Sequence, residues 1–147
     1  MYGSTGGNAS TDAAQKTDIM VAALVCELEE VAKDQVCIIG DLNADLEDIP
    51  MALDLVENEG WKDMGANAEN WGGVKDEPTC MAPNSKKATR RDYILVNQKM
   101  FQNVQAFQVE HTDSFATHQP IMAKVRMGDL SITKKVIEKP SGAYKPL

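Results

Sequence analysis

The sequence predicts a mixed α/β (α+β) fold in which one short strand carries the candidate site. A stripe of apolar residues at helical spacing over residues 12–33 is followed by a largely β-branched run at 36–39. That run ends in Gly-Asp-Leu-Asn at 40–43, which would place a carboxylate and a carboxamide in the loop after a buried strand. Ligands gather at the carboxyl ends of strands in open α/β sheets, so this loop is a candidate site. An Asx-rich turn that only ends the strand would contain the same residues.

The composition is that of one soluble globular domain. The 147 residues suffice for a single core, and 43% of them are hydrophobic and 25% charged. The net charge of −7 excludes a basic footprint for nucleic acid over the fold as a whole. A polyanionic substrate would therefore need local basic residues or a bound metal ion.

The cysteines indicate a reducing compartment. Cys26, Cys37 and Cys80 are odd in number and contain no Cys-x-x-Cys, so they predict neither a disulfide framework nor a zinc site. The first residues lack the basic and apolar regions of a signal peptide, and no apolar run reaches transmembrane length. We expect an intracellular protein, cytoplasmic or nuclear, that has no membrane partner.

In chain order, the first half predicts a loop, a helix, the site strand and a second helix. Residues 1–10 are rich in Gly and Ser and read as a loop, and the helix over 12–33 packs through its apolar stripe. After the Asp-rich loop, Asp48 and Pro50 mark the start of the second helix and Gly60 its end.

The second half predicts strands separated by loops. In order we expect an extended segment at 61–64, a long loop at 65–90, a strand at 91–96, a turn at 97–100, a strand at 104–109, a polar loop at 112–119 and a last strand at 120–127. Residues 1–127 form the domain in this interpretation. Residues 128–147 are a tail or linker with at most a short strand at 130–133.

The long loop ends in the only dense basic cluster, which consists of Lys86, Lys87, Arg90 and Arg91. Such a cluster is often a solvated face. Against the acidic background of this chain it is also a candidate for the local phosphate contact.

Of the two histidines, His118 is the better catalytic candidate. It lies in a polar loop just before Pro120, whereas a lone histidine such as His111 is more often structural. A carboxylate that fixes the tautomer and stabilises the imidazolium is the usual partner for proton transfer, and Asp92 is the natural candidate.

Taken in order, four short motifs resemble the later motifs of the endonuclease/exonuclease/phosphatase superfamily, which has the deoxyribonuclease-like fold. They are Gly-Asp-Leu-Asn at 40–43, Pro-Thr at 78–79, Arg-Asp-Tyr-Ile-Leu at 91–95 and His-x-Pro at 118–120. The opening Tyr-Gly-x-Thr-Gly at 2–6 is similar to that family's tyrosine-containing loop, which precedes the packing helix. The resemblance covers roughly residues 1–127 and extends to the endonuclease domains of non-LTR retroelements.

The resemblance implies a role for each matching residue. Asp41 would activate or orient the attacking water, Asn43 would contact the phosphate oxygens, and Tyr2 would contact the phosphate. Asp92 would orient His118, which would stabilise the pentavalent phosphorane or exchange a proton. Mg²⁺ (or Mn²⁺), with Asp41 as a candidate ligand, would offset the charge on the phosphoryl oxygens. Arg90 and Arg91 in the basic cluster are the expected substrate-binding cations.

The resemblance also implies that part of the family's fold is missing. That fold is a two-layer β-sandwich flanked by helices, and the chain corresponds to its C-terminal portion, with the N-terminal half missing. The missing half would supply an Asn and a metal-binding Glu, and Thr117 stands where the family has an Asp. We expect self-association or a partner to cover the face that the missing half leaves open.

These observations favour a metal-dependent phosphodiester hydrolase of endonuclease type, with nucleic acid as the expected substrate. Two alternatives remain open at this point. One is a catalytically inactive remnant that serves as a binding or assembly module, and the other is a phosphatase acting on a small phosphoester.

Overall fold

The computed structural model describes residues 1–4, 11–29 and 34–128, and within them it has a mixed α+β fold with three helices and two antiparallel sheets. The elements in order are α1 (Thr11–Leu28), β1 (Cys37–Asp41), the 3-10 helix η3 (Leu46–Asp48), α2 (Pro50–Glu57), β2 (Lys62–Asp63), the 3-10 helix η4 (Ala68–Trp71), β3 (Asp92–Val96), α3 (Gln98–Phe101), β4 (Val104–Val109) and β5 (Ile121–Val125). The predicted mixed fold class is thereby confirmed. Within the described ranges, no helix is both long and apolar enough to cross a membrane.

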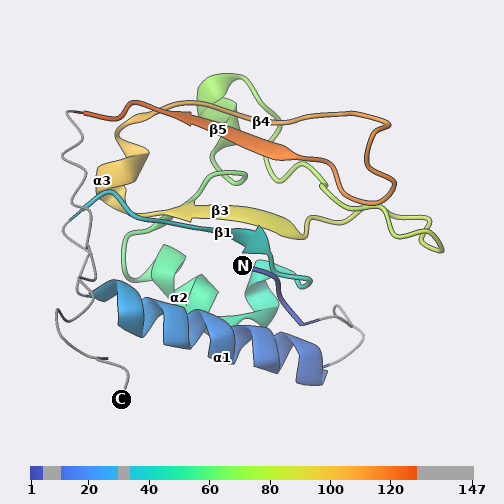
Figure 1. Ribbon diagram of the computed structural model, residues 1–147, viewed down its shortest axis with the longest axis horizontal. Coiled ribbons are helices and arrows are strands. Elements are labelled where there is room, and N and C mark those ends of the chain that lie inside the picture. The colour runs from blue at the N-terminus through green and yellow to red at the C-terminus, as the bar shows by residue number, and fades with distance from the viewer. Residues whose placement is uncertain (5–10, 30–33, 129–147) are drawn as a thin grey trace, which may run out of the picture.

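The molecule is layered, as Figure 1 shows. Helices α1 and α2 cover one side of the three-stranded sheet, whose strand order is β1-β3-β2, and the β4–β5 hairpin lies on its other side. Burial of apolar side chains on both sides of the central sheet holds these layers together.

Each interface has its own apolar core. Between the helices and the sheet, Val21 of α1, Ile49 before α2 and Leu95 of β3 are almost completely buried. Between the two sheets lies the second cluster, which consists of Met64, Ala68, Ile94, Val96 and Phe107. Strand β3 supplies residues to both cores because successive side chains of a strand point to opposite faces.

The antiparallel register of β1 and β3 positions the candidate site. It pairs Asp41, the last residue of β1, with Asp92, the first residue of β3. Residues 1–4 run beside the end of β1, where Tyr2 forms a parallel bridge with Asp41 and the Gly3 amide donates to the Asp41 carbonyl at 2.5 Å. A Cβ at Gly40 would overlap the carbonyl oxygen of Met1, so this close approach requires glycine.

Several predicted boundaries move. The first helix is described only to Leu28, and residues 30–33 lie outside the description. The site strand is shifted by one to two residues to 37–41, because β3 continues to pair with it as far as Asp41. The predicted turn at 97–100 is mostly the short helix α3, in which the Asn97 side chain caps the amide of Met100.

The region predicted as a long loop, 65–90, is more ordered than its composition indicates. It contains η4, and Cys80 forms an antiparallel bridge with Thr89. The last strand is shorter than predicted and ends at Val125. Most of the predicted tail, including the segment 130–133, lies outside the described residues.

Candidate functional site

Two carboxylates and one imidazole meet at the end of the β1–β3 pair. His118 Nδ1 lies 2.8 Å from Asp92 Oδ2, and His118 Nε2 lies 3.8 Å from Asp41 Oδ2. The side chain of Asp41 is 11% exposed, that of Asp92 is 17% exposed, and that of His118 is 35% exposed. The group is therefore partly sheltered, and solvent and solutes reach it mainly from the histidine side.

The three residues come from separate parts of the chain. Asp41 and Asp92 are brought together by strand pairing, as described above. His118 lies in the loop before β5, and the segment 79–80 joins this loop to the sheet. Cys80 forms an antiparallel bridge with His118, and the Gln119 amide donates to the Thr79 carbonyl at 2.7 Å.

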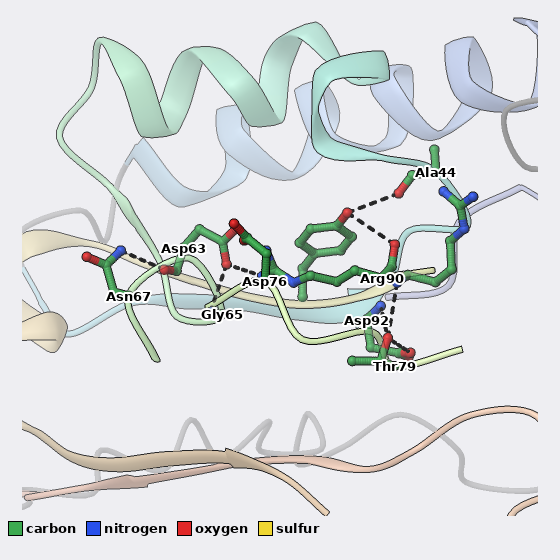
Figure 2. A network of polar contacts seen from close by, with 10 residues as sticks. Ala44, Asp63, Gly65, Asn67, Asp76, Thr79, Arg90 and Asp92 are labelled. Carbon is green, nitrogen blue, oxygen red and sulfur yellow. Dashed lines mark hydrogen bonds and ion pairs between the residues drawn. The ribbon is translucent and has the colours of Figure 1, made fainter. Parts of the chain in front are cut away.

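Thr79 holds Asp92 in position beneath the histidine. Its side chain is buried, and its hydroxyl donates to Asp92 Oδ2 at 2.7 Å. The hydroxyl oxygen of Thr79 also accepts the backbone N–H groups of Arg91 and Asp92, each at 3.0 Å (Figure 2). All the hydrogen-bonding capacity of a hydroxyl is thus used. The sequence drew attention to the Pro-Thr pair, but not to this positioning role.

Burial raises the pKa of the Asp41 carboxyl above its usual range, and the neighbouring Asp92 adds to this rise. The Asn43 amide, which donates to Asp41 Oδ1 at 2.9 Å, and the positive charges of His118 and Arg91 act in the opposite direction. A carboxylate in this setting is less stable as an anion, so a cation beside it would be favoured.

Asn43 and Tyr2 both lie beside Asp41. Asn43 has a φ of 54°, a left-handed conformation that asparagine tolerates better than most residues. Its carboxamide nitrogen donates to the Gly3 carbonyl at 3.0 Å and so ties residues 1–4 to the site. The side chain of Tyr2 is 63% exposed.

The two arginines expected to bind substrate lie in different places. Arg91 pairs with Asp45, with its Nη1 3.0 Å from Asp45 Oδ1, and its positive charge acts on Asp41. Arg90 extends away from Asp92 toward Asp63 and Asp76, as Figure 2 shows.

The surroundings of Arg90 are those of a structural ion pair. Both of its terminal nitrogens contact the carboxylate of Asp63, and the guanidinium carbon lies 4.4 Å from the ring centre of Tyr93. The side chains of Arg90 and Asp63 are only 12% and 4% exposed. In this conformation the charge of Arg90 is used within the fold and not at the group formed by Asp41, Asp92 and His118.

Cys80 is a neighbour that the sequence reasoning missed. Burial raises the pKa of its thiol, and the negative charges of Asp92 and Asp41 raise it further. The residue is therefore held as a neutral thiol beside two carboxylates. Its widely spaced position in the sequence contained no signal of this proximity.

The donor set of the site fits a divalent cation. One ligand atom each from Asp41, Asp92 and His118 can be chosen so that all three lie within 4.8 Å of one another. Carboxylate oxygens suit Mg²⁺ and Mn²⁺, while an imidazole nitrogen adds affinity for the transition metals. The Asp92 contact to Nδ1 leaves Nε2 as the ring nitrogen that faces Asp41.

Comparisons with known proteins identify no relative from which a function could be inferred. No protein-family model matches the chain, and no curated protein matches it significantly.

Proposed function

We propose that this protein is a metal-dependent phosphodiester hydrolase of endonuclease type, related to the endonuclease/exonuclease/phosphatase superfamily that its motifs resemble. One observation carries the proposal. His118 is hydrogen-bonded through Nδ1 to Asp92 and presents Nε2 toward Asp41 across 3.8 Å. A histidine oriented by one carboxylate and facing a second is suited to moving a proton beside a reacting phosphate.

The roles follow from the contacts. Asp92 accepts the Nδ1–H and stabilises the imidazolium, so Nε2 can donate a hydrogen bond or a proton to a phosphoryl oxygen. Asp41, whose raised pKa makes it a better proton acceptor than an ordinary carboxylate, orients the attacking water. Thr79 is a positioning residue, because it acts on the substrate only through Asp92.

Mg²⁺ or Mn²⁺ held by the Asp41 carboxylate, with His118 left to donate its proton, would neutralise charge that develops on the phosphoryl oxygens. Such help matters here because the chain carries a net charge of −7 and its substrate is an anion. The positive charge of Arg91, which acts on Asp41, would add to this effect. Nucleic acid is the proposed substrate.

Nicking of supercoiled DNA by the purified chain tests the proposal. We expect nicking that requires a divalent cation and stops on chelation. Both Asp41→Ala and His118→Ala should slow it by about a hundredfold or more. His111→Ala is the matched control, since His111 is exposed and pairs with Glu77 outside the site. Nicking that survives Asp41→Ala and His118→Ala equally well would refute the assigned roles.

A second candidate function is a catalytically inactive binding or assembly module. It is favoured by Thr117, which stands where the related motif has an Asp, and by the carboxamide of Asn43, which is bonded to Gly3. This candidate predicts a cooperatively folded protein without metal-dependent turnover on DNA. Turnover of inositol phosphates in place of DNA would instead identify a phosphatase that acts on small phosphoesters.

Self-association is part of the proposal. A cleft of about 370 Å³ between the two sheets is lined only by apolar side chains, and Ile39 and Met122 at its rim are 51% and 43% exposed. A second copy that covers this cleft would remove that surface from water. Sedimentation analysis of the wild type and of Ile39→Lys tests this: the substitution should shift a dimer toward the monomer. A monomeric wild type at high concentration would count against self-association.

A further inference from the structure

The gap between His118 and Asp41 is too wide for a hydrogen bond and suits a bridging metal ion. His118 Nε2 lies 3.8 Å from Asp41 Oδ2. A hydrogen bond from a ring nitrogen to an oxygen spans about 2.7–3.2 Å, so these two atoms are not hydrogen-bonded. Nitrogen and oxygen ligands lie about 2.0–2.2 Å from Zn²⁺, so two ligands of one ion are at most roughly 4.3 Å apart. One ion in this gap can therefore reach both atoms.

The two side chains would have to move little to bind such an ion. Ligands at the tetrahedral angle that Zn²⁺ prefers are roughly 3.4 Å apart, so the 3.8 Å gap would have to close by about 0.4 Å. His118 is the more exposed of the two residues, so an ion would enter from its side.

The contacts of each side chain aim its ligand atom at the gap. Oδ1 of Asp41 accepts the Asn43 amide at 2.9 Å, and the oxygen that lies opposite Nε2 is Oδ2. His118 Nδ1 lies 2.8 Å from Asp92 Oδ2. Because an ionised carboxylate only accepts hydrogen bonds, Nδ1 is the donor, and Nε2 of the neutral ring keeps its lone pair on the side of Asp41.

Asp92 has the position of a carboxylate that orients a metal-bound histidine. Histidine ligands usually donate their other ring N–H to such a group, which fixes the tautomer and makes the ligating nitrogen more basic. Asp92 is itself held by the Thr79 hydroxyl at 2.7 Å. The chain of contacts from Thr79 through Asp92 therefore preorganises Nε2 of His118 as a ligand.

Mg²⁺ and Zn²⁺ would use this group differently. Mg²⁺ prefers oxygen ligands, retains several waters and is commonly bound by one or two carboxylates, so it can bind Asp41 and leave His118 free. Zn²⁺ binds imidazole nitrogen well, and its affinity for a given mixed site exceeds that of Mn²⁺. The nitrogen in the gap therefore favours Zn²⁺ over the ions that would support hydrolysis.

We propose that Zn²⁺ binds between His118 Nε2 and Asp41 Oδ2 and thereby switches the proposed hydrolase off. The inference rests on the proposed function, because it assigns regulation to the same residues. When Zn²⁺ takes Nε2, the proton on that nitrogen goes to solvent, so His118 can no longer donate it to a phosphoryl oxygen. The same ion occupies the carboxylate that would hold Mg²⁺ and orient the attacking water.

Substitutions should show which side chains hold the ion. Asp41→Ala and His118→Ala should each abolish Zn²⁺ binding. Asp92→Asn should weaken it roughly 10- to 100-fold, which is the usual cost of losing a carboxylate that orients a metal-bound histidine. His111→Ala is the matched control, because His111 is the other histidine of the chain and lies 2.7 Å from the carboxylate of Glu77.

The experiment measures binding and inhibition separately on the full chain. Metal-free protein is titrated with Co²⁺, whose absorption spectrum reports the type of ligand, and Zn²⁺ is then added to displace it. Thermal melts with and without Zn²⁺ give a second measure, since an ion that binds only the folded state raises Tm. The same proteins are assayed for Mg²⁺-dependent nicking of supercoiled DNA at increasing concentrations of Zn²⁺.

Binding that requires His118 and Asp41, survives His111→Ala and inhibits nicking over the same range of Zn²⁺ concentration would support the proposal. Equal Zn²⁺ affinity in the wild type and His118→Ala would overturn it. Loss of binding in His111→Ala would also overturn it, because the ion would then lie at His111 and Glu77. A charge-transfer band from a thiolate to Co²⁺ would do the same by placing the ion at a cysteine. Zn²⁺ that binds His118 and Asp41 without slowing the nicking would overturn the switch.

The two readouts separate this inference from the proposed function. If nicking depends on Mg²⁺ and Asp41 but Zn²⁺ neither binds nor inhibits, the hydrolase stands and the zinc site fails. If Zn²⁺ binds through His118 and Asp41 but Mg²⁺ and Mn²⁺ support no nicking, the zinc site stands and the hydrolase fails.

Discussion

The hydroxyl of Thr79 donates a hydrogen bond to Oδ2 of Asp92 at 2.7 Å, and the same carboxylate oxygen lies 2.8 Å from Nδ1 of His118. A buried threonine, a carboxylate and a histidine thus form one chain of contacts that ends at Asp41. The orientation of the imidazole depends on each link of this chain, and each link can be tested separately.

Thr79→Val should damage both stability and activity. The substitution keeps the shape of the side chain but leaves the partly buried amides of Arg91 and Asp92 without their acceptor, at a cost of about 1–3 kcal/mol for such a group. Urea denaturation measures the loss, and Thr79→Ser is the control that restores the hydroxyl. If Thr79→Val were as stable and as active as the wild type, Thr79 would not be needed to position Asp92.

Asp92→Asn should lower the rate without unfolding the protein. An amide in this place can present its NH₂ group to Nδ1, which favours the wrong tautomer and no longer stabilises the imidazolium. We expect a fall in kcat of roughly a hundredfold or more, with little change in KM. A change confined to KM would mean that Asp92 contacts the substrate and does not act through His118.

Asp41→Asn should stabilise the fold at neutral pH while it abolishes activity. The pKa of Asp41 is raised on folding by burial, so the folded state holds this proton more tightly than the unfolded state does. The contribution of Asp41 to the free energy of unfolding is therefore most favourable at acidic pH. It becomes unfavourable as the pH rises through the raised pKa. Thermal melts in chelator should show the variant more stable than the wild type near neutral pH.

That advantage should disappear at pH values below the unfolded pKa of an aspartate, where both states of the wild type are protonated. A difference that does not change with pH would contradict the assigned cause. Addition of Mn²⁺ should stabilise the wild type and not the variant, because Asp41 is one of the three candidate ligands.

Arg90→Met should destabilise the protein but should not change the number of contacts that the protein makes to DNA phosphates. It leaves the carboxylate of Asp63 buried without its partner, which typically costs about 3–5 kcal/mol. Asp63→Asn in the same chain should recover part of that loss. The salt dependence of DNA binding should stay that of the wild type, because the structure turns Arg90 away from the site. A shallower salt dependence in the variant would mean that Arg90 does contact a DNA phosphate, as the sequence analysis expected.

The candidate site residues are far apart in the sequence, and the fold brings them together. Asp41 was expected just after one strand and Asp92 at the start of another, and antiparallel pairing of those strands brings them together. The pairing of His118 with Asp92 followed from chemistry alone, since a histidine in a polar loop needs a carboxylate to orient it. Neither periodicity nor composition could indicate Thr79 or Cys80, because their roles arise from contacts across the chain.

The sequence by itself determined the mixed fold, the site strand and the types of residue that could act on a phosphate. These properties are local, since hydrophobic period, turn residues and side-chain chemistry are read over a few positions. Tertiary structure alone decided which acidic partner each arginine meets. Arg90 and Arg91 are neighbours in the sequence, but Asp63 pairs with Arg90 and Asp45 pairs with Arg91. These partners come from distant segments, so no local pattern in the sequence indicates them.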